Sequence, residues 1–434
     1  MKDCITLTIH MRDAFDEIEK RFIHKSTGLP LNYTGLDGTV ILPSEEEVEQ
    51  GKPSMLSWNC PIEDGAYYGG LYLSALVNLA LYSDIPVKTA AKRVANGLIS
   101  LSETETDGFV ARNYIGDKKV HYAIGSNDQT FPWFYGLWMY YRSNIPTNEE
   151  KANIKERLSS VALALEKLDW KIPSDPLSVG FRGDYKTKTV NDVAKLLFIH
   201  RAMYELTSND EWLDKYHKYL NSYPDKSDEK RIDILRRGAA VEEYDHGSVF
   251  YCIKDGEAAE EVFGQPVSLM TYPFFTKAMV DIALRALIDM ETDDDIKEAY
   301  NEGLLKDAEA SLSHIERYKG FDISNAPRFS PDWRAMNVMW KPHNTANEAH
   351  EIAWSQMSVW FRECPRFPYE NAFVREPLYA GFVSVLGRAE VSSSDKEKII
   401  DMLNHYPWEK LNTSTFYVAL CLYGQMLANE QAQR

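Results

Sequence analysis

The sequence has few cysteines, and their arrangement points to neither a metal site nor a disulfide framework. Its five cysteines are scattered along 434 residues, and no two of them form a CxxC pair. An odd, dispersed set argues against a disulfide-stabilised scaffold and gives no zinc-binding pattern. A Gly-rich phosphate loop, a dinucleotide fingerprint and a nucleophile elbow are also missing, which disfavours nucleotide and serine-hydrolase chemistry. We therefore expect no metal and no cofactor.

Positive charge and long apolar runs are scarce as well. The formal net charge is −17, and no basic stripe of the kind that binds nucleic acid is present. No apolar run approaches the roughly 20 residues of a membrane-spanning helix, and the N-terminus lacks the apolar region of a signal peptide. We expect a soluble protein that binds neither nucleic acid nor membrane. It would be cytoplasmic, or periplasmic or secreted if a signal peptide was removed; the sequence indicates no oligomeric state.

Aromatic residues, in contrast, are abundant. The chain contains 10 Trp and 25 Tyr, which is more than a protein core usually needs. This content fits a carbohydrate-binding groove, although large helical cores also take up aromatic side chains. The rest of the composition, 44% hydrophobic and 26% charged, is that of an ordinary globular protein.

Three aspartates, Asp64, Asp128 and Asp192, stand at equal steps of 64 residues, and each opens a largely apolar stretch of helical character. Further helix starts recur at a similar step, near Leu269, Asn347 and Asn412. A period of this kind indicates six repeats of one helical hairpin. If the repeats form a ring, the three aspartates share one end of it.

The predicted helices alternate between two kinds. Amphipathic helices are expected at about residues 7–22, 87–102, 148–168, 209–220, 295–318 and 394–406. Helices that are apolar almost all round are expected at about residues 67–82, 133–141, 193–206, 269–288, 353–361 and 416–427. Because a helix without a polar face is buried on all sides, the alternation predicts an all-α protein in which six outer and six inner helices form an (α/α)6 barrel.

Glycines inside the apolar helices, such as Gly70 and Gly136, indicate close approach of helix backbones or otherwise tight helix packing. No linker or change of composition divides the chain, so we expect one domain over residues 1–434. In such a ring the N-termini of all inner helices converge on one face, where they present partial positive charge and unpaired N–H groups. Long irregular segments also enter this face, which makes it the expected place for a site.

The helix alternation, the repeat length and the strings Asp107-Gly-Phe-Val-Ala-Arg112 and Ser126-Asn-Asp128-Gln resemble the six-hairpin glycosidase superfamily. The similarity covers nearly the whole chain as architecture, and only these short strings as motifs. Members of the superfamily include inverting hydrolases, unsaturated glucuronyl hydrolases and phosphorylases, and related toroids are polysaccharide lyases. The resemblance implies a glycan substrate and a functional role for aspartates at inner-helix starts.

Glycoside hydrolysis uses two carboxyl groups on either side of the bond, about 6.5–9.5 Å apart in an inverting enzyme. Neighbouring inner-helix starts can supply that separation, so we predict Asp128 as the proton donor and Asp64 as the base. Glu63 is a competing carboxylate beside Asp64. The alternative for each aspartate, and above all for Asp192, is that it caps its helix.

A second group of polar residues, His343, Glu348 and His350, leads into the helix expected at residues 353–361. Its spacing matches no zinc motif, and a capping box is the alternative for Glu348. Arg112 is a candidate for binding a substrate carboxylate, or for pairing with Asp64 or Asp128. The remaining expected substrate contacts are Trp58, Asn59, Gln129, Trp133, Asp192, His246, Trp340 and Trp354.

The main expectation is a glycoside hydrolase that acts on an oligosaccharide, with uronic-acid-containing glycans as candidates. Two alternatives stay open. A polysaccharide lyase would use Tyr244 and His246 to remove a proton beside a uronate carboxyl, although a surface turn is the simpler interpretation of that segment. A non-catalytic glycan-binding toroid would keep the aromatic surface but lack two carboxylates at hydrolytic distance.

Overall fold

The computed structural model describes residues 2–240, 274–387 and 392–433. Helices hold 65% of the residues and strands 4%, which confirms the all-α class. The strands within these ranges form two short antiparallel hairpins, β1 (Tyr114–Ile115) with β2 (Val120–His121) and β3 (Lys171–Pro173) with β4 (Phe181–Asp184). None of the described helices is long and apolar enough to cross a membrane.

Six of the described helices are buried over most of their length. They are α3 (Gly65–Tyr82), α5 (Asn127–Arg142), α7 (Val190–Thr207), α11 (Phe274–Met290), α15 (Glu376–Gly387) and α17 (Tyr417–Ala432). Helix α3 packs against α5 and α17, α11 packs against α7 and α15, and α15 packs against α17. Side chains from all six contribute to one hydrophobic core. The predicted start of α11 near Leu269 lies outside the described residues.

Amphipathic helices bury one face against this core. They are α1 (Lys2–Arg21), α4 (Lys88–Ser100), α6 (Asn148–Lys167), α8 (Asp210–Leu220), α12 (Asp294–Ile315) and α16 (Ser393–His405), which confirms the positions predicted for this kind of helix. Side-chain caps define several of their first turns. Thr147 and Glu150 form a capping box at α6, and Asp293 accepts two backbone N–H groups at the start of α12.

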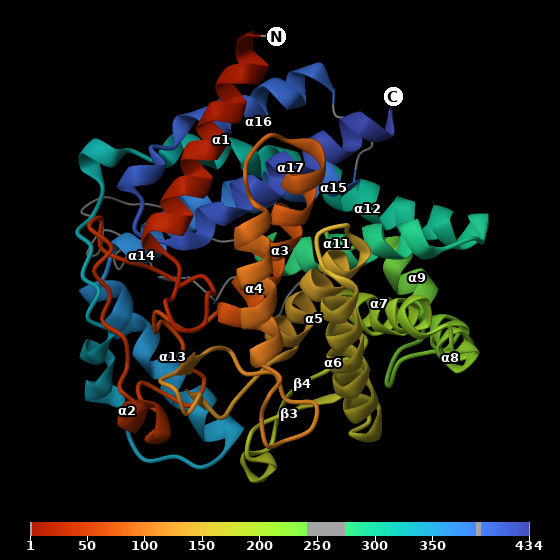
Figure 1. The fold of residues 1–434 in the computed structure, drawn as a ribbon, viewed down its shortest axis with the longest axis horizontal. Coiled ribbons are helices and arrows are strands. Elements are labelled where there is room, and N and C mark those ends of the chain that lie inside the picture. The colour runs from red at the N-terminus through yellow and green to blue at the C-terminus, as the bar shows by residue number, and fades with distance from the viewer. Residues whose placement is uncertain (1, 241–273, 388–391, 434) are drawn as a thin grey trace.

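Short helices and single turns connect these elements. They are α2 (Glu45–Glu49), α9 (Arg231–Arg237), α14 (Arg366–Glu370), η1 (Leu177–Val179), η2 (Glu316–Gly320), η3 (Ile323–Asn325), η4 (Trp333–Met339), the π-helical turn η5 (Asn371–Arg375), η6 (Trp408–Lys410) and η7 (Ser414–Phe416). In Figure 1, α1, α16 and α17 lie at the end of the molecule that carries both termini, and α2 and α13 lie at the opposite end.

The fifth of the buried helices along the chain is α15, not the segment predicted at residues 353–361. That segment belongs to α13 (Ala346–Glu363), which packs against η4 and builds a second, smaller core in which Trp333 and Trp360 are buried. One face of α13 is exposed, so the segment is amphipathic. The helix that joins the main core is α15, which contacts α11, α12 and α17.

Two glycines let α3 and α5 approach until their backbones touch. A Cβ atom at Gly70 would clash with the carbonyl group of Pro132, and one at Gly136 would clash with the backbone of Gly70. The helix backbone at both positions is regular, so the requirement for glycine is steric. This contact confirms the close approach predicted from the sequence, and it brings together the helix that follows Asp64 and the helix whose first turn contains Asp128.

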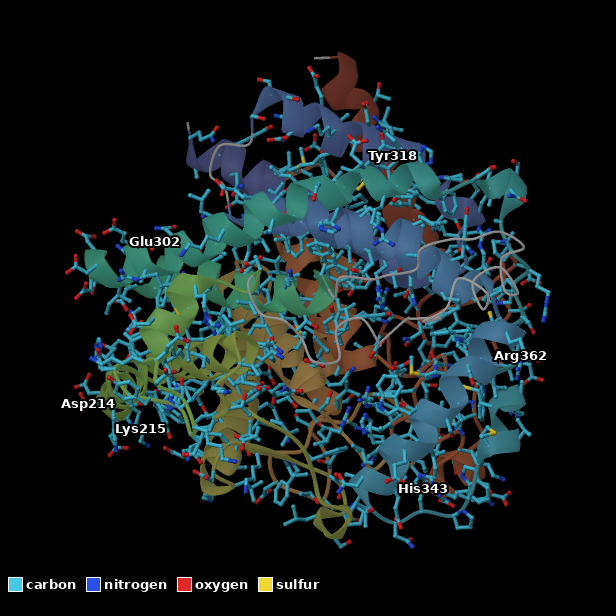
Figure 2. The ribbon with its side chains drawn as sticks, turned by 180° about the vertical axis from the view of Figure 1, so that it is seen from behind. Asp214, Lys215, Glu302, Tyr318, His343 and Arg362 are labelled. Atoms are coloured by element: carbon cyan, nitrogen blue, oxygen red, sulfur yellow. The ribbon has the colours of Figure 1, made fainter. Side chains whose placement is uncertain are left out.

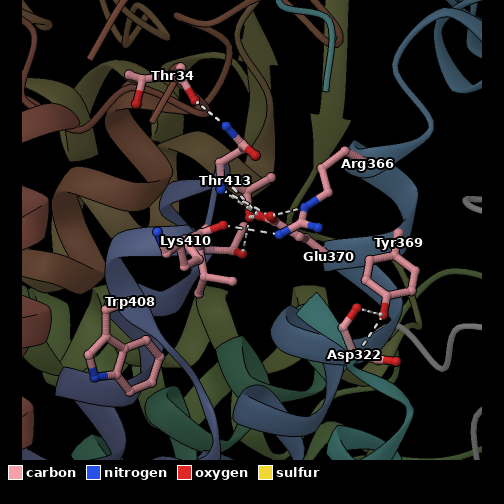
Figure 3. Close-up of polar contacts among 12 residues, drawn as sticks. Thr34, Asp322, Arg366, Tyr369, Glu370, Trp408, Lys410 and Thr413 are labelled. Atoms are coloured by element: carbon pink, nitrogen blue, oxygen red, sulfur yellow. Dashed lines mark hydrogen bonds and ion pairs between the residues drawn. The ribbon is translucent and has the colours of Figure 1, made fainter. Parts of the chain in front are cut away.

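A buried carboxylate, Glu370, ties α14 to the segment before α17 (Figure 3). It accepts from Arg366 Nε at 2.6 Å, from the N–H groups of Asn412 and Thr413, and from Thr413 Oγ1. The Arg366 side chain is 4% exposed and that of Glu370 is 0% exposed. Because its donors come both from α14 and from the segment before α17, Glu370 holds together segments that are distant in the sequence.

Two buried acids, Asp281 on α11 and Asp307 on α12, interact with one another. Asp307 accepts the N–H groups of Ala239 and Ala240, whereas both oxygens of Asp281 lack a donor among the described residues. Burial raises the pKa of both groups, and the neighbouring Asp307 raises that of Asp281 further, while Lys277 acts in the opposite direction. A protonated Asp281 can therefore donate a hydrogen bond to Asp307.

Asp281→Asn is expected to flatten the dependence of stability on pH. A carboxyl whose folded-state pKa is raised contributes stability that is present below its unfolded value, roughly 4, and is lost as the pH rises through the folded value. An amide keeps the hydrogen bond and does not titrate, so the variant should unfold at a higher temperature than the wild type at pH 8–9. Thermal unfolding of both proteins from pH 5 to pH 9 measures this. Asp294→Asn, at a side chain that is 98% exposed, is the control, and parallel curves for wild type and Asp281→Asn would contradict the shared proton.

Candidate functional site

A cavity of about 280 Å³, the main pocket, opens where the first residues of several buried helices meet. Asp64 directly precedes α3, Asp128 lies in the first turn of α5, and Phe275 lies in the first turn of α11. Arg375 directly precedes α15, and Arg182 enters from β4. The pocket brings together six of the predicted site residues: Trp58, Asn59, Asp64, Arg112, Asp128 and Gln129.

The carboxylate of Asp64 is held by side chains from three other segments. Asn32 Nδ2 donates to Oδ2 at 2.8 Å, and Gln129 Nε2 donates to Oδ1 at 2.7 Å. Arg112 Nη1 lies 3.8 Å from Oδ1. The two amides are themselves oriented, because Asn32 Oδ1 accepts the N–H of Asp64. Gln129 Oε1 in turn accepts the N–H of Tyr67. The Asp64 carboxyl group is therefore held by two amides, each of which is itself oriented by a backbone N–H group.

Glu63 lines the same pocket beside Asp64. Burial raises the pKa of both carboxyl groups, and the charge of Asp64 raises the pKa of Glu63 further. Arg112 favours the charged form of both without cancelling the effect of burial. The N–H of Asn59 donates to Glu63 Oε2 at 2.6 Å. Two adjacent carboxyl groups of this kind titrate as a pair and retain a proton above the ordinary carboxyl range.

Asp128 has different surroundings. Lys195 Nζ donates to Asp128 Oδ1 at 3.0 Å. The Lys195 side chain is 0% exposed within α7, whereas the side chain of Asp128 is 41% exposed to the pocket and solvent. A buried ammonium group needs an anionic partner, and Asp128 supplies it. The main pocket thus combines a buried pair of adjacent carboxyl groups with a partly exposed carboxyl group that is ion-paired with Lys195.

Arg182 is a pocket cation whose guanidinium group is only partly paired by the described residues. Its Nε is buried without a hydrogen-bond acceptor among the described residues. Its guanidinium carbon lies 5.7 Å from the centroid of the Trp58 ring, which supports it by a cation–π contact. Burial, and then the nearby Arg112, lower its pKa to about 10, so it remains charged at neutral pH. An incompletely paired guanidinium at a pocket is suited to binding a carboxylate or another anion.

None of the three evenly spaced aspartates caps its helix as the alternative predicted. Asp64 occupies the capping position of α3 but its side chain makes no capping hydrogen bond. Ser126 caps α5, and Thr189 caps α7. The alternative prediction, that each aspartate caps its helix through its side chain, is therefore wrong for Asp64, Asp128 and Asp192.

Asp192 lies outside the main pocket, in a neighbouring groove. Its Oδ1 accepts from Asn127 Nδ2 at 2.8 Å, and its Oδ2 accepts from the hydroxyl groups of Thr187 and Thr189. Burial raises the pKa of Asp192, and Lys195 opposes this effect. The carboxylate therefore orients Asn127, which lines both the groove and the main pocket.

Of the other predicted contacts, two lie at the edge of the pocket. His350 and Trp354 contact the ring of Trp58 edge-on, with centroid separations of 5.5 and 6.0 Å, and so support a residue that lines the pocket without lining it themselves. Trp133 is 0% exposed and donates from Nε1 to the carbonyl of Leu98, which places it in the core.

The remaining predicted contacts do not line the pocket either. His343 Nε2 accepts the N–H of Met55 and lies at the end of the molecule where α13 begins (Figure 2). Trp340 Nε1 donates to the carbonyl of Gly51. Glu348 is exposed and forms a capping box with Thr345, as its alternative predicted. His246, together with Tyr244, lies outside the described residues.

Several important residues were not predicted from the sequence. Asn32 gave no signal, because its contact with Asp64 joins the segment after α1 to the start of α3. Lys195 did carry a signal: a single lysine within the apolar stretch 193–206 requires a buried anionic partner. Arg375 belongs to a π-helical turn whose place beside the pocket depends on the unpredicted helix α15.

Across residues 2–240, 274–387 and 392–433, no group of three or more His, Cys, Asp or Glu side chains is arranged to hold a metal ion. Carboxyl, guanidinium, amide, hydroxyl and aromatic side chains line the pocket. Comparisons with protein-family models, with curated proteins and with solved structures find no match.

Proposed function

We propose that the protein is a glycoside hydrolase that cleaves a uronic-acid-containing oligosaccharide in the main pocket. One observation carries the proposal: a single pocket holds the buried Glu63–Asp64 pair, whose pKa values burial raises, and Asp128, which forms an ion pair with Lys195. Glycoside hydrolysis needs two carboxyl groups in different surroundings, one as an acid and the other as a base or nucleophile.

The proposed architecture is a single-domain (α/α)6 barrel. Contacts link α3 to α5, α5 to α7, α7 to α11, α11 to α15, α15 to α17 and α17 back to α3, and this succession supports an inner ring of six helices. The six amphipathic helices would form the outer ring. In this arrangement α13 and η4 belong to the connection between α12 and α15. The architecture is the one implied by the resemblance to six-hairpin glycosidases.

The surroundings of the carboxyl groups favour the opposite roles to those expected from the sequence. A proton donor must hold its proton near neutral pH, and burial provides this for the Glu63–Asp64 pair. A base must be an anion, and Asp128 forms an ion pair with the ammonium group of Lys195. We therefore assign the donor to the pair, with Asp64 as the member in contact with α5 through Gln129, and the base to Asp128.

The substrate class follows from Arg182. Glu63, Asp64 and Asp128 would repel an anionic sugar, so an acidic substrate needs a cation that is not already neutralised. Arg182 meets this need, since its buried Nε has no acceptor among the described side chains and its charge persists at neutral pH. A uronate carboxylate is planar and bidentate, which matches the geometry of a guanidinium group.

The experiment is a screen of uronic-acid-containing and neutral oligosaccharides with the wild type and with Arg182→Gln. The variant is expected to raise KM for acidic substrates roughly ten- to hundredfold, the effect of losing a charged hydrogen bond of about 1.5–3 kcal/mol, and to leave KM for any neutral substrate unchanged. Arg362→Gln, at an exposed position on α13 (Figure 2), is the control.

Each result of the screen has a defined meaning. Equal effects on acidic and neutral substrates would contradict the uronate assignment. Products that absorb in the ultraviolet without consumption of water would indicate a lyase. Binding without any cleavage would indicate a glycan-binding protein.

A further inference from the structure

A second depression, the hairpin groove, adjoins the main pocket. It has a volume of about 620 Å³ and lies between β4, the first turn of α7 and the first turn of α13. Asn127 and Gly183 line both the groove and the main pocket, so the two spaces are neighbours that share a wall. Gly183 has no side chain, and its φ of +109° is one that other residues rarely adopt.

The two spaces differ in charge. Arg112, Arg182 and Arg375 line the main pocket together with the three acids Glu63, Asp64 and Asp128. The groove has one cation, Lys171, and two acids: Asp184, and Asp192, whose oxygens already accept hydrogen bonds from Asn127, Thr187 and Thr189. Carboxylates accept hydrogen bonds from sugar hydroxyl groups and repel a second carboxylate. The groove is therefore suited to a sugar unit without negative charge, in contrast to the main pocket.

The groove also has an apolar surface for the C–H face of a sugar ring. Phe181 lines it and is 43% exposed, so its ring is accessible from the groove. Phe181 and Arg182 are consecutive residues of β4, and consecutive strand residues point to opposite sides. One strand thus presents Arg182 to the main pocket and Phe181 to the groove.

We propose that the hairpin groove is a second sugar subsite that binds a neutral unit linked to the acidic unit in the main pocket. The inference rests on the proposed function and adds to it the class of substrate: an oligosaccharide in which a uronic acid is joined to an uncharged sugar. Phe181 is the residue that distinguishes this substrate from a free uronic acid, because it contacts the second unit only.

Binding to the full-length protein, measured by isothermal titration calorimetry, tests the subsite. Glucuronic, galacturonic and mannuronic acid are titrated first. The acid that binds most tightly is then compared with two disaccharides that join it to xylose through sulfur, one in each order of linkage. The sulfur linkage resists hydrolysis. One disaccharide is expected to bind about fivefold more tightly than the free acid, the order of magnitude for one aromatic contact. A disaccharide of two uronic acids is expected to show no such gain.

Phe181→Ala should remove the gain and leave binding of the free acid unchanged, and Phe181→Trp should retain it. The matched control is Leu177→Ala, because Leu177 is also 43% exposed and precedes β4 but does not line the groove. If the free acid binds and neither disaccharide binds more tightly, or if Phe181→Ala retains the gain, the subsite is overturned while the proposed function stands. If none of the three acids binds, the proposed function fails and the subsite fails with it.

Discussion

Asp64→Asn is expected to lower kcat about 10²–10⁴-fold for a substrate with a sugar leaving group, the usual contribution of a general acid. The same variant should keep most of its activity toward a nitrophenyl glycoside of the same sugar, because a nitrophenolate leaves without a proton. Asp128→Asn should lose activity toward both substrates, because activation of water is needed whatever the leaving group. The comparison therefore separates the two roles through the leaving group rather than through activity alone.

The pH dependence gives an independent measure of the same assignment. Because the Glu63–Asp64 pair holds its proton above the ordinary carboxyl range, the wild type should keep its activity to a pH well above roughly 4 and lose it as the pair is deprotonated. Toward the nitrophenyl substrate this loss at high pH should be absent. Glu63→Gln is the companion variant. It removes the neighbouring acid of Asp64, so the loss of activity at high pH should occur at a lower pH than in the wild type.

The opposite pattern would contradict the assignment. If Asp128→Asn were the variant that spares the nitrophenyl substrate, then Asp128 would be the proton donor and Asp64 the base, as the sequence alone suggested. Circular dichroism of each variant is the control for folding. Asn at position 64 can still receive a hydrogen bond from Asn32 or Gln129 through its carbonyl oxygen, so the fold should tolerate it.

Glu370→Ala is expected to destabilise the protein by about 3–5 kcal/mol, the effect of removing one partner from a buried ion pair. The variant would leave the guanidinium of Arg366 buried without its partner and the N–H groups of Asn412 and Thr413 without their acceptor. The midpoint of urea unfolding should fall accordingly. Because Glu370 lies outside the main pocket, the folded variant should retain substrate binding.

Two further variants identify the cause of that loss. Glu363→Gln removes an exposed ion pair with Arg328; the Glu363 side chain is 45% exposed and that of Arg328 is 61% exposed. This variant should change the free energy of unfolding by less than about 1 kcal/mol. Arg366→Met combined with Glu370→Ala removes the unpaired charge and should recover part of the stability. If Glu370→Ala were no worse than Glu363→Gln, the cluster in Figure 3 would not be a source of stability.

The sequence predicted the helices well because burial leaves a pattern along the chain. The apolar stretches at α3, α5, α7 and α17 and the charged faces of the amphipathic helices placed most of the described elements. The prediction failed at α13 because Trp354, Trp360 and Phe361 serve a second core rather than the main one. The apolar run Leu378–Leu386 in α15 was the better candidate, but it departs from the period that the earlier helices set.

The sequence predicted the pocket in part, because helix starts are visible in the sequence and loop packing is not. Asp64, Asp128 and Gln129 follow from the helix starts, and the structure places them together. Asn32 comes from a segment with no periodic signal, and only the folded chain brings it to Asp64. The roles of the acids were equally inaccessible, since they depend on Lys195 and on burial.

The contact between Gly70 and Gly136 also bears on the stereochemistry of the proposed reaction. These glycines set the spacing of α3 and α5, and hence the gap between the carboxyl groups at the starts of the two helices. In glycoside hydrolysis a gap of about 5–5.5 Å gives retention of anomeric configuration, and one of roughly 6.5–9.5 Å gives inversion. The anomeric configuration of the product would then depend on Gly70 and Gly136, two residues in the core that do not contact the sugar.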